Sequence, residues 1–294
     1  MSDRRMLLVA HTGREDIYAT ASIARQRLAD AGIDLVALPG EGAGLDLTVY
    51  DHETDLLDCP VELVLAMGGD GTLLRAAEQA RVLDVPVVGV NLGRVGFLAE
   101  ADVSEVDAAL TAVVDRTYRL AERMTVEFAV EVDGEEIATG WALNEISVEK
   151  GMRERILDVV VEVDGHGVSA YGCDGVLCAT PTGSTAYAFS AGGPVVWPGV
   201  DALLVTPLNA HALFARSLVV APTATVTVHI DPGGQSAVLT CDGRRTVEVP
   251  PGARIHVRKG DSPVKMVRLG DLPFTDRLVR KFALPVHGWR QQRH

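Results

Sequence analysis

The sequence predicts an N-terminal α/β domain built on a parallel sheet, followed by a C-terminal domain rich in antiparallel strands. The chain has 294 residues, which is more than one compact core usually absorbs. Over residues 1–117, apolar runs typical of buried strands alternate with stretches of helical spacing, the order expected of a parallel sheet covered by helices. Over residues 118–275, apolar residues recur at every second position, which is the period of a half-buried strand.

The α/β domain begins with a strand, a helix and a second strand. A buried strand is predicted for the run "RMLLVA". Residues 15–31 then carry apolar side chains at helical spacing, and Gly32 ends that helix before the strand "IDLVAL". Residues 39–58 are rich in Gly and Asp and predict a loop.

Two further strands of this domain each end in a glycine-rich turn. The strand "VELVLAM" leads into "GGDGT" at 68–72 and a helix over 72–81, and the strand "VPVVGV" leads into "NLGRVGFLAE" at 91–100 and a helix over 104–114. Open α/β sheets bind ligands at the carboxyl ends of their strands, so both turns are candidate binding segments. Phe97 in the second turn offers an apolar face for a flat ring, or belongs to the core.

The C-terminal domain shows the pattern of consecutive hairpins. Alternation runs through "TVEFAVEVDGEEIATGWALNEISVEK" and "ILDVVVEVDGHGVSAYGCDGVLCAT", with turn signals at Asp133-Gly134 and Asp164-Gly165. The runs "ATVTVHI", "SAVLTCDG" and "ARIHVRK" continue it. Residues 276–294 predict a short helix and a basic tail, and we expect them to pack back on the first domain.

Composition narrows the classes of function. The net charge of −13 argues against broad binding to the phosphates of nucleic acid, which needs a basic face. No apolar run approaches the roughly 20 residues of a membrane span, and no secretory signal is evident, so we expect a cytoplasmic protein without a membrane partner. The four cysteines form no CxxC pair, which favours buried reduced thiols over a metal site.

The "GGDGT" turn carries the clearest chemistry. Its glycines permit a close approach of backbone to ligand, and the first N–H groups of the next helix can face phosphate or hydroxyl oxygens. Asp70 is the one acid in this turn, and an ordinary helix-capping role is the alternative for it. The sequence contains no GxxxxGK[ST], which excludes a P-loop, and no GxGxxG after its first strand.

Two segments of the C-terminal domain add polar groups. Asn144 and Glu145 fall within a strand pattern, where neighbours point to opposite faces, so one of them is not simply solvated. Asn144 offers both a donor and an acceptor to a sugar or base. The segment 171–198 contains "TPTGST", whose small hydroxyl residues suit ribose and amide groups, together with the Tyr187 ring and the Asp174 carboxylate.

Taken in order, "GGDGTLL", "NLGRVGFLAE", "NE" and "DGVLCATPTGSTAYAFSAGGP" resemble the NAD kinase family, and the closing "LPVHGWR" resembles its actinobacterial members. The resemblance covers nearly the whole chain. The "GGDGT" turn alone is shared with diacylglycerol, sphingosine and phosphofructokinase relatives, whereas "TPTGSTAY" combined with "NE" is specific. The resemblance implies a C-terminal β-sandwich, an active site between the domains, and phosphorylation of NAD by ATP to give NADP.

The resemblance also implies roles for single residues. Asp70 would accept the proton of the adenosine ribose 2′-hydroxyl, and Asn144 and Glu145 would bind ribose. Asp174 would meet the nicotinamide end, and Phe97 would lie near the adenine. The remaining candidates for contact with substrate are Gly68, Gly69, Gly71, Thr72, Arg75, Arg155, Thr182, Thr185, Ala186, Tyr187, Ser190 and Arg244.

Arginine and histidine residues complete the implied site. Arg75 is the candidate for phosphate, and Arg155 would place a cation close to the substrate. Arg244 stands in "CDGRR", where relatives often carry Gln, so the sequence departs from the family pattern there. His211 and Arg216 are retained, and both a substrate contact and a structural role stay open for them.

The implied substrates are NAD and ATP, with polyphosphate as an alternative donor, and the implied assembly is a homodimer or homotetramer. Mg²⁺ or another divalent cation would arrive with ATP, because no dedicated cluster of oxygen ligands is evident in the sequence. A lipid kinase of the GGDGT superfamily is one alternative, but it predicts an apolar cleft or a basic membrane face. A non-catalytic NAD(H) sensor is the other, and it favours loss of Asp70 or of the loop residues, which are all present.

Overall fold

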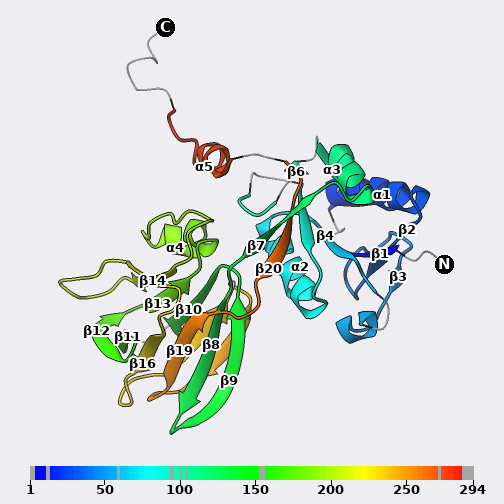
Figure 1. The fold of residues 1–294 in the computed structure, drawn as a ribbon. Helices are drawn as coiled ribbons and strands as arrows, with labels where there is room; N and C mark the ends of the chain where they lie inside the picture. The colour runs from blue at the N-terminus through cyan, green and yellow to red at the C-terminus, as the bar shows by residue number, and fades with distance from the viewer. Residues whose placement is uncertain are drawn as a thin grey trace. The chain divides into compact units, whose positions relative to one another are not determined.

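The computed structural model describes residues 4–10, 14–57, 60–92, 96–99, 101–102, 105–151, 156–270 and 273–286. The chain forms two compact units, Met1–Glu122 with Val264–His294, and Arg123–Pro263. The first unit is α/β, and the second is built mainly of antiparallel strands with a short helix, α4 Tyr187–Ser190, so the predicted fold class is confirmed (Figure 1). The chain returns to the first unit with Val264, before the boundary expected at residue 276.

The first unit is organised around one sheet with the strand order β3-β2-β1-β4-β5-β20-β7, with β6 beside β5. The pairs from β3 to β20 run parallel. Strands β4 and β5 are buried along their whole length, as expected where helices cover both faces. The bounds are β1 Arg4–Ala10, β2 Ile33–Ala37, β3 Thr48–Val49, β4 Leu63–Met67, β5 Val87–Asn91, β6 Ala101–Asp102, β7 Arg119–Arg123 and β20 Val264–Arg268.

Helices α1 and α3 lie against one face of this sheet, and α2 lies against the other (Figure 1). α1 buries Ile17, Ala21, Ala24 and Leu28, the residues whose spacing predicted it. α2 begins at Asp70 and not at Thr72 as predicted. The bounds are α1 Glu15–Asp30, α2 Asp70–Val82, α3 Val106–Val114 and α5 Phe274–Phe282. Among the described residues, no helix combines the length and apolar character that a membrane crossing needs.

The segment predicted as a loop over 39–58 is more ordered than the sequence indicated. It contains β3 and a 3₁₀ turn at Glu53–Leu56. Leu45 and Leu56 are almost fully buried and anchor the segment to the unit. Two isolated leucines between Gly and Asp residues show no periodicity, so the pattern gave no sign of this packing.

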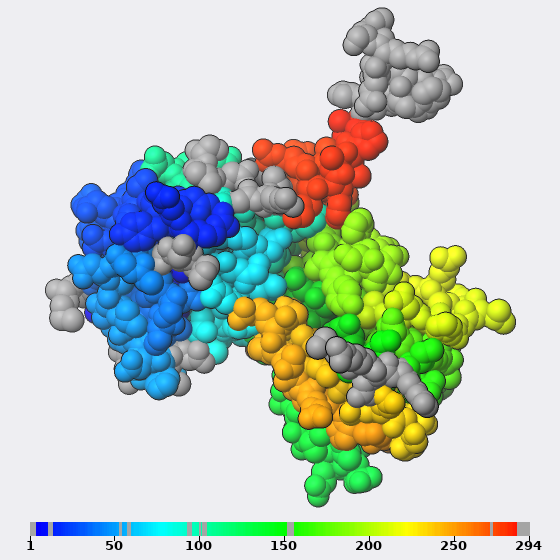
Figure 2. All heavy atoms as spheres, turned by 180° about the vertical axis from the view of Figure 1, so that it is seen from behind, coloured from blue at the N-terminus to red at the C-terminus, as the bar shows by residue number. Residues whose placement is uncertain are grey.

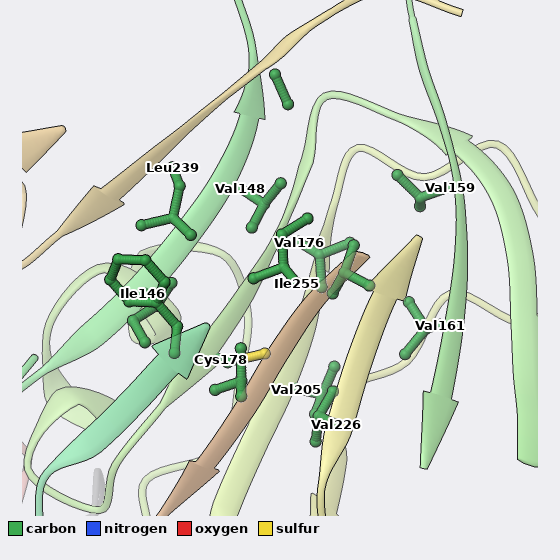
Figure 3. Packing of buried hydrophobic residues seen from close by; sticks show 14 of the residues in the cluster. Ile146, Val148, Val159, Val161, Val176, Cys178, Val205, Val226, Leu239 and Ile255 are labelled. Atoms are coloured by element: carbon green, nitrogen blue, oxygen red, sulfur yellow. The ribbon is translucent and has the colours of Figure 1, made fainter. Parts of the chain in front are cut away.

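The second unit is a sandwich of two six-stranded antiparallel sheets, ordered β15-β14-β13-β10-β17-β18 and β12-β11-β16-β19-β8-β9. Alternate side chains from both sheets form one apolar core, shown in Figure 3. The bounds are β8 Val126–Val132, β9 Glu135–Ala142, β10 Glu145–Lys150, β11 Leu157–Val163, β12 His166–Cys173, β13 Gly175–Ala179, β14 Leu203–Leu208, β15 Leu218–Val220, β16 Val226–Ile230, β17 Ala237–Cys241, β18 Arg245–Val249 and β19 Arg254–Lys259. Three cysteines are buried free thiols, as predicted, and Cys59 lies outside the described residues.

The hairpins of this sandwich turn where the Asp-Gly pairs predicted. Asp133 and Gly134 both have positive φ, as do Asp164 and Gly165. Two consecutive residues at positive φ give the turn whose twist matches the right-handed twist of the flanking strands. A third pair, Asp242-Gly243, adopts the same conformation between β17 and β18.

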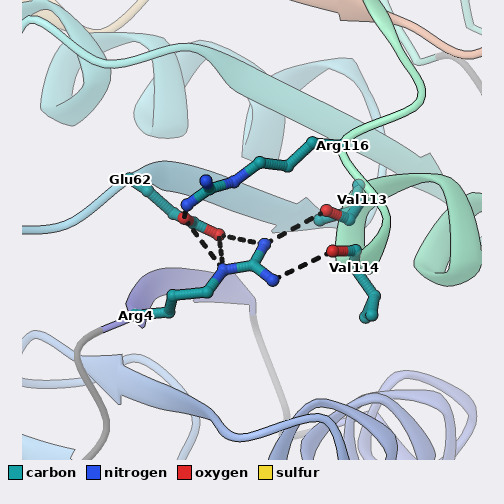
Figure 4. A network of polar contacts seen from close by, with 5 residues as sticks. All are labelled: Arg4, Glu62, Val113, Val114 and Arg116. Atoms are coloured by element: carbon teal, nitrogen blue, oxygen red, sulfur yellow. Dashed lines mark hydrogen bonds and ion pairs between the residues drawn. The ribbon is translucent and has the colours of Figure 1, made fainter.

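A partly exposed ion network ties three elements of the first unit together (Figure 4). The Arg4 guanidinium contacts Glu62 at 2.7 Å and donates to the carbonyl of Val114 at 2.9 Å. Arg116 pairs with the other oxygen of the same carboxylate. Burial raises the pKa of Glu62, but hydrogen bonds from Arg4 and Arg116 outweigh it and hold that pKa below its usual value.

We predict that Glu62→Gln lowers the free energy of unfolding by about 1–2 kcal/mol at neutral pH, because two charge-assisted contacts are lost. Since the folded pKa of Glu62 is lowered, its contribution is present above the ordinary Glu pKa and is lost as the pH falls. Urea unfolding at neutral and acid pH measures this difference. Glu136→Gln, at an exposed hairpin position, is the control. An equal loss at both pH values would contradict the ionic origin.

Candidate functional site

The "GGDGT" turn connects the buried end of β4 to the first turn of α2. A Cβ on Gly68 would lie 2.4 Å from the Thr72 hydroxyl oxygen, so the turn needs glycine there. Gly69 is the residue before the helix, and no side chain caps this end. Asp70 is therefore the first helical residue and not the N-cap, which excludes a helix-capping role for it.

The Asp70 carboxylate lies against the second glycine-rich turn. Its two oxygens face the backbone N–H groups of Phe97 and Leu98, each at 3.4 Å. These contacts are long for N–H···O hydrogen bonds and leave the carboxylate weakly held. A Cβ on Gly96 would lie 2.2 Å from Asp70 Oδ1, so only glycine permits this approach. The two turns meet at one edge of the sheet, as their positions after β4 and β5 predicted.

The turn beside Asp70 is supported by the C-terminal helix. The Phe97 ring packs between Phe274 and Phe282 of α5, with centroid distances of 6.0 and 5.5 Å. Arg277 is buried and donates to the carbonyls of Phe97 and Ala99, at 3.2 and 2.9 Å. The core alternative for Phe97 thus matches its contacts, and its place beside an adenine stays a prediction. No motif points to Arg277, which lies 180 positions from its acceptor Phe97.

Arg75 follows Asp70 on α2 and forms an ion pair with Glu41. The distance between Arg75 Nη1 and Glu41 Oε1 is 2.8 Å, and the same carboxylate accepts the N–H of Ala10 at the end of β1. The guanidinium is therefore fixed near the carboxyl ends of the strands. Its role toward phosphate stays a prediction, as do the roles of Gly69, Gly71 and Thr72.

In the second unit, Asn144 lies outside the strands, and the strand position predicted for it is wrong. It occupies a bend between β9 and β10, where the chain passes from one sheet of the sandwich to the other. Only Leu143 and Asn144 separate the two strands, and the bend contains no Gly or Pro, so no turn signal marks it. Asn144 is buried, and its carbonyl accepts the Thr180 N–H at 2.9 Å. A Cβ on Gly183 would lie 2.0 Å from that carbonyl oxygen, so the "TPTGST" segment packs directly on Asn144.

Glu145 begins β10 and is 5% exposed. Its carboxyl group accepts the backbone N–H of Tyr187, while Oε2 is buried without a hydrogen-bond partner among the described residues. Burial raises the pKa of Glu145 to about 8, and the nearby Asp242 and Glu149 carboxylates add to the rise. Glu145 is therefore largely protonated at neutral pH and can donate a hydrogen bond.

A pocket of about 490 Å³, a volume typical of small-molecule sites, lies at the other end of β10, where Glu149 and Lys150 line it. Asp174 lines it, with Lys150 Nζ at 2.7 Å and Asn209 Nδ2 at 2.8 Å. Hydrogen bonds from Lys150 and Asn209 lower the pKa of the Asp174 carboxyl. The Tyr187 hydroxyl donates to Glu149 at 3.1 Å, and its ring is 40% exposed. Ser190 and Ala191 complete one wall.

The remaining predicted residues are less closely grouped. Thr182, Thr185 and Ala186 are half-buried on the segment after β13, and the Thr185 hydroxyl donates to the Thr182 carbonyl. Arg244 is exposed in the turn between β17 and β18. The backbone N–H of His211 donates to the Gly172 carbonyl, whereas Arg216 is exposed. Arg155 lies outside the described residues.

Comparison with known families matches both units. The model of the ATP-NAD kinase N-terminal domain matches residues 6–118, and that of the ATP-NAD kinase C-terminal domain matches residues 143–269. The chain belongs to the ATP-NAD kinase family. This confirms the resemblance drawn from the motifs.

Relatives in this family are similar over nearly the full length. The chain is 52% identical to a NAD kinase of Mycolicibacterium paratuberculosis over 98% of both proteins, and 53% identical to one of Rhodococcus erythropolis over 98% of this chain and 96% of that protein. A NAD kinase 2 of Streptomyces avermitilis is 52% identical over 99% of this chain and 98% of its own length. All three sources are actinobacteria, as the closing "LPVHGWR" indicated.

Solved structures of the family share the fold. The yeast NADH kinase crystallised with NADH has a TM-score of 0.86 at 20% identity, covering 97% of this chain and 88% of that chain. The NAD kinase of Archaeoglobus fulgidus in complex with ATP has a TM-score of 0.72 at 24% identity, covering 95% of this chain and 98% of that one.

Sequence reasoning missed several residues of the site in this NAD kinase family member. Lys150, Glu149 and Asn209 line the pocket; the first two end the strand that "NE" begins, and Asn209 follows β14, but none belongs to a motif. Asp242 lies beside Glu145, and its one sequence signal is the Asp-Gly pair after β17. That pair predicted a turn and gave no reason to expect a buried carboxylate.

We predict that the stability of the wild-type protein falls as the pH rises from about 4.5 to about 8, through the titration of Glu145. The folded pKa is raised, so the contribution is complete below the unfolded pKa and is lost as the pH rises. Glu145→Gln removes this part of the slope, which amounts to at most about 1.4 kcal/mol per pH unit. Urea unfolding between pH 5 and 9 measures it, with the exposed Glu248→Gln as control. Identical pH slopes for wild type and Glu145→Gln would contradict the assignment.

Proposed function

We propose that this protein transfers the γ-phosphoryl group of ATP to the 2′-hydroxyl of the adenosine ribose of NAD, giving ADP and NADP. The observation that carries the proposal is the Asp70 carboxylate at the start of α2. It lies at the carboxyl end of a parallel strand, among glycines that leave room for a substrate, in a chain of the ATP-NAD kinase family.

Asp70 is suited to accept a proton. Its only contacts to N–H donors among the described residues are long, and its side chain is half-buried, so a hydroxyl can approach it. The 2′-hydroxyl loses its proton to Asp70 as its oxygen attacks the γ-phosphorus, and ADP leaves on the opposite side. The N–H groups at the start of α2 and the positive end of its dipole stabilise phosphate oxygens.

The second unit supplies the dinucleotide contacts in this proposal. Asn144 and Glu145 bind ribose hydroxyls, with Glu145 donating a hydrogen bond from its protonated carboxyl group. The pocket around Asp174 takes the nicotinamide end, and the exposed ring of Tyr187 stacks on a flat group there. The described contacts support this assignment because Tyr187 links the two groups: its N–H reaches Glu145 at the start of β10, and its hydroxyl reaches Glu149 near the end of that strand, beside the pocket.

The finer features of the function follow from the family resemblance. A divalent cation, Mg²⁺ in particular, comes to the site with the phosphates of ATP as part of that substrate. Among the described residues there is no group of three or more His, Cys, Asp or Glu that could hold a metal ion. We also propose polyphosphate as an alternative donor, a homodimeric or homotetrameric assembly, and a cytoplasmic location.

We predict that Asp70→Asn lowers turnover of NAD with ATP by about 10²–10⁴-fold, because Asn keeps the size of Asp but accepts no proton. NAD affinity should stay within a few fold. Single-turnover rates of NADP formation and calorimetric titration with NAD measure the two quantities, and the exposed Asp34→Asn serves as control. Retained turnover would exclude Asp70 as the base, and loss of binding together with turnover would make it a substrate anchor instead.

Gly96→Ala checks the same carboxylate without altering it. The added Cβ would lie 2.2 Å from Asp70 Oδ1, so the side chain of Asp70 must move while the backbone stays in place. A displacement of this kind costs on the order of 10²-fold in turnover. At Gly199 a Cβ meets no atom within 4 Å, so Gly199→Ala controls for the substitution itself. Unchanged turnover in Gly96→Ala would contradict the need for this geometry.

A further inference from the structure

The side chain of Asp242 binds the backbone of residues 143–145, where the chain passes from one sheet of the sandwich to the other. Its Oδ1 accepts the N–H of Asn144 at 2.7 Å and that of Glu145 at 3.4 Å, and its Oδ2 accepts the N–H of Leu143 at 2.9 Å. Its own N–H donates to the Glu145 carbonyl at 3.0 Å. The carboxylate is 6% exposed. Three consecutive backbone groups are thus fixed by one side chain.

Arg245 supplies the countercharge to this buried carboxylate. Its Nη2 lies 3.3 Å from Asp242 Oδ2 and donates to the Trp141 carbonyl at 2.8 Å. Its guanidinium stacks over the Trp141 ring at 4.8 Å. The arginine therefore joins the start of β18 to the end of β9, directly before the three residues that Asp242 holds.

We propose that Asp242 is a positioning residue, whose carboxylate sets the backbone of Asn144 and Glu145 so that their side chains meet the ribose of the dinucleotide. The inference rests on the proposed function, because it takes Asn144 and Glu145 as the ribose contacts. It assigns a role to a residue that itself touches no substrate in this account.

The charges of the site follow from the same contacts. Asp242 has three N–H donors and Arg245, whereas the described donor to Glu145 is the single N–H of Tyr187. Burial raises the pKa of Asp242 above its usual value, and the three N–H donors and Arg245 limit that rise, whereas Glu145 has a single described donor and no counterion among the described residues. The negative charge of the pair therefore resides on Asp242, and Glu145 keeps its proton. The groups that act on Glu145 are Asp242, Glu149 and the Tyr187 N–H.

The test uses Asp242→Asn, which keeps the size of the side chain but loses the charge and one acceptor oxygen. We expect the KM for NAD to rise about tenfold or more, which corresponds to the loss of one hydrogen bond to a charged group. The KM for ATP should stay within about twofold. In addition, the pH above which NAD binding weakens, set by Glu145, should move lower, because one of the charges that raise its pKa is gone.

Two further variants make the test specific. Asp164 stands in an equivalent Asp-Gly turn and its carboxylate accepts the Thr225 N–H at 2.9 Å, so Asp164→Asn is the matched control, with unchanged KM for NAD. Arg245→Gln leaves the Asp242 carboxylate in place but removes its countercharge. We expect it to raise the KM for NAD while the KM for ATP stays within about twofold, and it carries the test if Asp242→Asn does not fold; an unchanged KM for NAD would overturn the inference.

The outcomes separate this inference from the proposed function. An active wild-type protein whose Asp242→Asn variant keeps both its KM for NAD and its pH midpoint would overturn the inference alone. Equal rises in the KM for NAD and for ATP, with an unmoved pH midpoint, would reduce Asp242 to a structural residue and overturn it also. If the wild-type protein forms no NADP and binds no NAD, both the proposed function and the inference fail.

Discussion

One buried carboxylate fixes the backbone where the chain passes between the two sheets of the sandwich. The side chain of Asp242 accepts the N–H groups of Leu143, Asn144 and Glu145, where the chain leaves one sheet and enters the other. A carboxylate buried without such donors would cost several kcal/mol, so the turn and the passage must form together. The carbonyl of Asn144 in turn accepts the N–H of Thr180, which packs the "TPTGST" segment against Asn144.

Asp70 also accepts backbone N–H groups, but more weakly than Asp242, and this difference fits a proton acceptor at Asp70 and a positioning residue at Asp242. Asp242 is almost fully buried, with contacts as short as 2.7 Å, and holds a fixed negative charge. Asp70 is half-buried and faces N–H groups at 3.4 Å, so its lone pairs stay available to a hydroxyl. Its support comes indirectly, from Arg277, which holds the carbonyls of the turn that lies against Asp70. A tightly bonded carboxylate would be a poor base at neutral pH.

The fold and much of the site could be predicted because their signals are local. Adjacent residues encode the order of β4, the glycine-rich turn with Asp70, and α2. They also encode the Asp-Gly hairpins. The bend at Asn144 could not be found, because it spans only two residues between strands and contains no Gly or Pro. Contacts such as Arg277 with Phe97 join segments 180 positions apart, and no short pattern reports them. The burial of Asp242 could not be predicted either, because an Asp-Gly pair predicts a turn but not whether the aspartate is buried.

The central claim is that Asp242 carries the charge while Glu145 carries the proton, and infrared difference spectroscopy tests it directly. A protonated carboxylic acid has a carbonyl stretch that a carboxylate lacks. We expect wild-type protein at pH 7 to show such a band, which disappears as the pH rises beyond about 8 and is missing at every pH in Glu145→Gln. A wild-type spectrum at pH 7 without that band, or one that Glu145→Gln leaves unchanged, would contradict the account.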